Sequence, residues 1–228
     1  MKTKFTSVIL CSLLAIGATF AESKTIPSAT SPDLVTIFEA PLVCQAAPAI
    51  GCGSRAKPML LDLEKTAGVS EAWLNRAGTR IAVIWKKEAK SGTRSDVAKK
   101  LEKEGAKEIQ GEDRKQAVAE ILSGRGWYRG ADVDRLSEEE AGIIAARWVA
   151  RVRAKTSLPP EKAEGLRRVI TDALKKCFTE EGEQEKYFAM LESEEGLQKF
   201  AGDYLSKEQI PFLKVAVEQG LRPLPNEK

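Results

Sequence analysis

Two cysteines, Cys44 and Cys52, are the residues of this chain best suited to chemistry. Gly51 and Gly53 flank Cys52, so the backbone there can approach a ligand closely. A helix is predicted over residues 54–65, and the exposed N–H groups at a helix start lower the pKa of a nearby thiol. Paired thiolates select soft ions such as Cu(I), Hg(II) or Zn(II). The pattern therefore predicts a metal site formed by Cys44 and Cys52.

The same two cysteines fit other roles. In an oxidising compartment they could form a disulfide that closes a short loop, or they could remain inert thiols. A third cysteine, Cys177, falls on the apolar stripe of a predicted helix and is expected to be a core residue. The sequence contains no histidine, which excludes histidine-based catalytic triads and histidine-ligated metals.

The first 21 residues are typical of a secretory signal peptide. Lys2 and Lys4 precede a short apolar run, and small residues end at Ala21. Cys11 lies inside this run and is expected to be removed with the rest of residues 1–21. We expect export to a bacterial periplasm or secretion, followed by a flexible leader over residues 22–33. No later segment is apolar enough to predict a transmembrane helix.

Charge excludes one class of partner. The formal net charge of +3 falls to +1 when Lys2 and Lys4 are removed, and no block rich in lysine and arginine stands out. A nucleic-acid-binding protein usually carries such a block. We therefore expect no nucleic-acid partner.

The elements around the cysteines alternate between strand and helix. Gly78 provides a turn between two predicted strands, because glycine accepts the left-handed backbone of a hairpin turn. The predicted order is strand 34–38, loop 40–53, helix 54–65, strands 69–75 and 80–86, helix 95–104 and strand 106–110. This βαββαβ order is that of a ferredoxin-like unit, here placed over residues 34–111.

Residues 34–110 resemble the heavy-metal-associated domain family, which includes copper chaperones and periplasmic mercuric-ion-binding proteins. The likeness is carried by Cys52, Gly68 with Val69, the hairpin at 75–78, the leucines of helix 54–65, and the segment 101–105. The family usually has two cysteines separated by two residues, whereas seven residues separate Cys44 from Cys52 here. The resemblance implies a ferredoxin-like fold and transport of a soft metal ion.

Residues 112–228 are predicted to be helical, which makes the fold class α+β. A capping-box sequence begins at Ser137, and Glu138, Glu139 and Glu140 are interpreted as partners of that helix dipole. A loop containing Trp127 and Tyr128 is expected to anchor the linker to the core. The strand over 80–86 is apolar on both faces, so we expect the helices from residue 137 onward to cover Trp73 or Trp85.

These observations predict an exported, non-enzymatic protein that binds or transfers a soft metal ion through Cys44 and Cys52. Its expected partner is a membrane transporter or another periplasmic protein. The alternative is a protein-interaction module that keeps the fold without metal, with the cysteines paired as a disulfide or inert.

Overall fold

The computed structural model describes residues 30–180 and 182–227. The predicted signal peptide and most of the predicted leader lie outside the described residues. Within them the chain is α+β and mostly helical, with one five-stranded antiparallel sheet and eight α-helices. The predicted fold class is confirmed at this level.

The sheet has the strand order β4-β1-β3-β2-β5, and every neighbouring pair is antiparallel. The two strands joined by the hairpin at Gly78 match the prediction within one residue. The last predicted strand is shorter than expected, and the aromatic loop forms an unexpected fifth strand on the edge of β2. The strands are β1 (Val35–Glu39), β2 (Val69–Asn75), β3 (Arg80–Trp85), β4 (Lys107–Glu108) and β5 (Trp127–Arg129).

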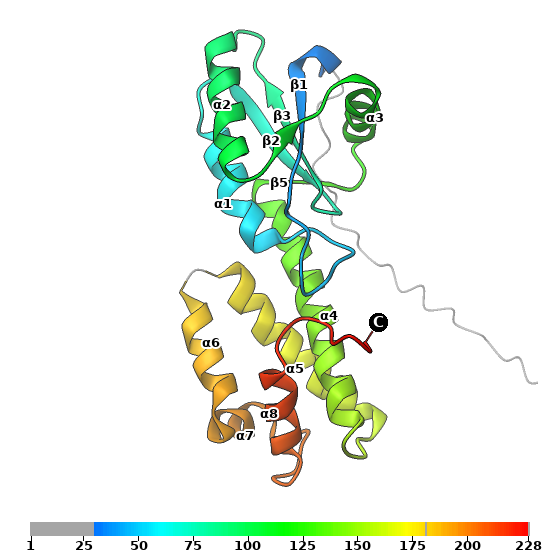
Figure 1. Ribbon diagram of the computed structural model, residues 1–228. Coiled ribbons are helices and arrows are strands. Elements are labelled where there is room, and N and C mark those ends of the chain that lie inside the picture. Colours follow the sequence, from blue (N-terminus) through cyan, green and yellow to red (C-terminus); the bar gives the residue numbers. More distant parts are fainter. Residues whose placement is uncertain (1–29, 181, 228) are drawn as a thin grey trace, which may run out of the picture.

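Both faces of the sheet are covered, as alternation along the strands requires. On β3, Ile81 and Val83 join the core beneath α1 (Gly53–Glu64) and α2 (Ser91–Lys103). Ala82 and Ile84 point the other way, into a second core with α3 (Gly111–Leu122). Figure 1 shows α3 on the side of the sheet opposite α1 and α2.

The expectation for Trp73 and Trp85 is wrong in detail. Trp73 is buried in the core that α3 covers, together with Ile121 and Trp127. Trp85 lies on the opposite face, where the Arg94 guanidinium of α2 stands 5.2 Å from its ring centre. The helix that shields the second face is therefore the one that follows the sheet directly in sequence.

Five helices form the rest of the described chain. One of the two longest, α4, runs from the edge of the sheet to the far end of the helical half (Figure 1). Helices α5 and α8 pack against α4, and α6 and α7 pack against α5 and α8. The five helices are α4 (Asp134–Arg153), α5 (Pro160–Thr179), α6 (Glu183–Glu192), α7 (Glu194–Ala201) and α8 (Ile210–Glu218). Two short 3-10 turns, Pro32–Leu34 and Gly130–Val133, precede β1 and α4. No helix of the described ranges is long and apolar enough to cross a membrane.

Two predicted helix starts are corrected. Ser137 lies in the first turns of α4 rather than before them, and it is fully buried against α1. A Cβ atom at Gly53 would stand 2.5 Å from the Ser137 hydroxyl oxygen, so α1 and α4 cross with almost no side chain between them. The helix predicted from Ser95 begins four residues earlier, at Ser91.

Candidate thiol site

The loop between β1 and α1 folds back on itself and places both thiols on one face. Val43 pairs with Gly51 in an antiparallel bridge. The Cys44 N–H donates to the Ile50 carbonyl at 2.8 Å, and the Cys52 N–H donates to the Leu42 carbonyl at 2.7 Å. Side chains alternate along such a pair, so Cys44 and Cys52 become diagonal neighbours on the same face. This ladder explains how two cysteines separated by seven residues meet.

The β2–β3 hairpin turn packs against this loop and is hydrogen-bonded to it. The Leu42 N–H donates to the Gly78 carbonyl at 3.0 Å, and the Gly51 N–H donates to the Arg76 carbonyl at 2.7 Å. Gly78 has φ +72°, and a Cβ atom at Gly51 would lie 2.8 Å from the Gly78 Cα. Backbone therefore packs directly on backbone, and the thiol positions are set before any ligand binds.

The two thiols differ in exposure. Cys44 is 2% exposed, and its sulfur accepts the Ala47 N–H at 3.3 Å. Cys52 is half-buried at the N-cap position of α1, with its sulfur 3.5 Å from the Ser54 hydroxyl oxygen. Both are free thiols. An incoming ligand therefore meets Cys52 first and Cys44 behind it.

Their protonation differs as well. A hydrogen bond from the Cys44 thiol lowers the pKa of Cys52 to about 5, and the Ser54 hydroxyl and Arg55 act in the same direction against the cost of burial. The same hydrogen bond, burial and the nearby Glu140 carboxylate raise the pKa of Cys44. Of the two thiols, Cys52 is therefore the more acidic.

Glu140 is a lining residue of the thiol cavity that the sequence interpretation missed. It belongs to α4, is 7% exposed and lines the cavity beside Cys44. Burial raises its pKa and so does the charge of Cys52, whereas the neighbouring Cys44 thiol lowers it. The prediction that Glu140 only complements a helix dipole is wrong. The sequence feature that could have revealed the burial of Glu140 is its place on the apolar stripe of a helix, one position before the buried Ala141.

The thiols line a cavity of about 280 Å³ between the two halves of the fold. Arg147 of α4 ties its walls together, because its guanidinium donates to the Ala46 carbonyl at 2.9 Å and also to the Leu221 carbonyl. The lining residues are Val43, Cys44, Gln45, Ala46, Cys52, Arg55, Glu140, Leu221 and Arg222.

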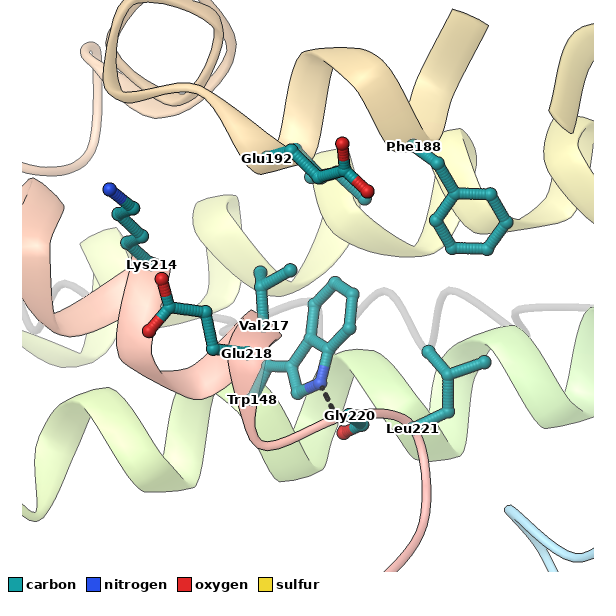
Figure 2. Close-up of a pocket in the computed structure, with 9 residues that line it drawn as sticks. Trp148, Phe188, Glu192, Lys214, Val217, Glu218, Gly220 and Leu221 are labelled. Atoms are coloured by element: carbon teal, nitrogen blue, oxygen red, sulfur yellow. Dashed lines mark hydrogen bonds between the residues drawn. The ribbon is translucent and has the colours of Figure 1, made fainter. Parts of the chain in front are cut away.

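A second cavity, of about 300 Å³, lies among α4, α6 and α8. Figure 2 shows Trp148 and Phe188 around it, with the Trp148 indole N–H donating to the Gly220 carbonyl at 3.1 Å. Its lining is mainly apolar and contains no sulfur. Leu221 lines both cavities, so the C-terminal segment separates them.

Cys177 does not belong to the thiol cavity. It lies on α5 with 2% of its surface exposed, as the sequence predicted for a core residue, and burial raises its pKa. Among the described residues, no group of three or more His, Cys, Asp or Glu side chains is arranged to hold a metal ion. Cys44 and Cys52 offer two sulfurs at the cavity, which suit a two-coordinate soft ion such as Cu(I) or Hg(II) better than four-coordinate Zn(II).

No protein-family model matches the chain, and comparison with curated proteins and with solved structures finds no match either.

Proposed function

We propose that this protein binds a soft metal ion between Cys44 and Cys52 and passes it on, without acting as an enzyme. The observation that carries the proposal is the placement of both thiols on one face of a rigid loop, with Cys52 half-exposed and Cys44 behind it. Two sulfurs are enough for Cu(I) or Hg(II), and the lowered pKa of Cys52 provides a thiolate at neutral pH.

The diagonal arrangement favours a bridging ion over a disulfide. Diagonal neighbours on an antiparallel pair have Cα atoms about 7–8 Å apart. A disulfide joins Cα atoms up to about 7 Å apart without backbone movement. Here the backbone is held by Gly78 and Arg76, so closing the gap would disturb the hydrogen bonds at the turn. A metal ion placed between the sulfurs fills the gap instead.

The proposal takes residues 34–111 as a ferredoxin-like unit of the heavy-metal-associated type, and the strand order supports the ferredoxin-like part of it. Strands β4-β1-β3-β2 with α1 and α2 on one face follow the βαββαβ sequence of that unit. The fifth strand and α3 are additions to it. In this proposal the protein is exported to the periplasm or secreted, and a membrane transporter or another exported protein receives the ion.

A titration tests the proposal. The reduced chain carrying Cys11→Ser, titrated with Hg(II) or Cu(I) against a competing monothiol, should retain about one equivalent, because two protein sulfurs hold an ion better than one. Cys52→Ser and Cys44→Ser should each lose this tight binding. Cys177→Ser is the matched control and should keep it, because Cys177 lies outside the cavity. Unchanged stoichiometry in Cys52→Ser would support the rival reading, an interaction module with inert thiols.

A further inference from the structure

Two arginines stand at the mouth of the thiol cavity, and neither has a carboxylate partner in the part of the chain that the structure describes. Arg55 and Arg222 line the same cavity as Cys52, and both are exposed. Across the described ranges neither side chain forms an ion pair, and Arg55 makes only a long contact of 3.5 Å to the Pro41 carbonyl. Arg129 and Arg151, by contrast, each bind carboxylates closely. The mouth of the cavity therefore offers two guanidinium groups for an external anion.

Both arginines come from segments with fixed backbones. Arg55 lies in the first turn of α1, three residues after Cys52. The Arg222 carbonyl accepts a hydrogen bond from Arg151 at 2.9 Å. Just before it, the Gly220 carbonyl accepts one from Arg151 at 2.8 Å and one from Trp148 (Figure 2). Two distant parts of the chain thus bring cationic groups to one thiolate.

The charge count also favours an anion. When two thiolates hold a divalent ion, their charges cancel. The other charged side chains that line the cavity are then Arg55, Arg222 and Glu140. Glu140 is buried next to Cys44, whereas the two arginines face the solvent side. A planar guanidinium is well matched to a carboxylate, which it binds through two parallel hydrogen bonds.

We propose that the cavity receives its metal ion as a complex with a small anionic thiol, a thiol-carboxylate whose carboxylate binds Arg55 and Arg222. This inference rests on the proposed function. A cavity of about 280 Å³ suits a ligand of this size. In this inference the arginines orient the complex so that its metal faces Cys52.

Transfer is a ligand exchange without change of oxidation state. For a mercury complex with two thiolates, the Cys52 thiolate forms a bond to the metal and one thiolate of the carrier leaves. The Cys44 sulfur then binds the metal and its proton goes to the second leaving thiolate. The products are the ion held by Cys44 and Cys52, one free thiolate and one free thiol.

The test compares two carriers that differ in charge. Hg(II) is supplied to the reduced Cys11→Ser, Cys177→Ser chain as its complex with 3-mercaptopropionate or with neutral 2-mercaptoethanol, and the transfer rate is followed by stopped-flow absorbance. We expect transfer from the anionic carrier to be roughly fivefold faster, the effect of one exposed ion pair at the upper end of its usual strength. Added salt should reduce the preference.

The double variant Arg55→Gln, Arg222→Gln should transfer from both carriers at one rate. Arg153→Gln is the matched control and should keep the preference, because this exposed arginine lies on α4 about 20 Å from Glu140 at 1.5 Å per residue. Equal rates for both carriers in the parent chain, or a preference that survives the double variant, would overturn the inference. Binding of uncomplexed Hg(II) measures the proposed function separately, so the two failures are distinguishable.

Discussion

Replacing Gly78 with alanine should damage both stability and the thiol site, because this glycine supports the loop of Cys44 and Cys52. Two effects add. Gly78 has φ +72°, where a Cβ atom costs about 1 kcal/mol. That Cβ would also lie 2.4 Å from the Leu42 carbonyl oxygen and 2.5 Å from the Gly51 Cα, and both are backbone atoms that cannot rotate away.

The loop must therefore shift. The shift breaks or lengthens the hydrogen bond from the Leu42 N–H to the Gly78 carbonyl and the one from the Gly51 N–H to the Arg76 carbonyl. Each is worth about 1 kcal/mol. With the strain included, Gly78→Ala should lower the free energy of unfolding by about 3 kcal/mol, measured by urea denaturation.

Gly126→Ala is the matched control. Gly126 has nearly the same backbone angle, φ +70°, but no atom lies within 4 Å of its would-be Cβ. Only the strain of about 1 kcal/mol applies there. Gly78→Ala should also weaken Hg(II) binding while Gly126→Ala leaves it unchanged. Equal losses of stability in the two variants would refute the claim that the hairpin turn supports the thiol loop.

Two further predictions concern the packing of α3 and of the C-terminal segment. Ile121→Ala should cost about 2–5 kcal/mol in urea denaturation because Ile121 is fully buried between α3 and the sheet, and Leu122→Ala, at a half-buried position, should cost less. Equal losses of stability in the two variants would contradict the packing of Ile121 between α3 and the sheet. Glu227→Gln should lower stability at pH 7 by about 2 kcal/mol, since Glu227 accepts two hydrogen bonds of 2.8 Å from the buried Arg151. The hydrogen bonds with Arg151 lower the pKa of Glu227 to about 2. The stability that Glu227 contributes is therefore complete above pH 4.5 and should vanish as pH falls through 2. A stability difference between wild type and Glu227→Gln that is constant from pH 7 to 2 would contradict this.

Residue types and their spacing predicted the helices and strands whose formation depends on residues close in sequence. Alternation and Gly78 predicted the hairpin, and the proline pair at 159–160 predicted the start of α5. Tertiary contacts decided the rest. Ser137 reads as a helix cap in sequence, but its close approach to Gly53 places it inside α4. The edge strand β5 has three residues and depends on β2 for its hydrogen bonds, so no periodicity could reveal it.

The residues of the candidate site were also predictable only in part. Cys44 and Cys52 share one loop, so their types and flanking glycines could be read from the sequence. Glu140 and Arg222 reach the cavity from positions 88 and 170 residues after Cys52, and only folding brings them there. One clue was present: Glu140 interrupts the apolar stripe of its helix, which is unusual for a carboxylate without a buried partner.

The most direct test of the account is the metal-edge X-ray absorption spectrum of the one-to-one Hg(II) complex, prepared with a phosphine reductant so that every sulfur comes from the protein. The chain should carry Cys11→Ser and Cys177→Ser, which leaves Cys44 and Cys52 as its only cysteines. A metal bridging these two thiols predicts a first shell of two sulfur atoms. A first shell with one sulfur, or with only oxygen and nitrogen, would contradict the claim that Cys44 and Cys52 form the binding site.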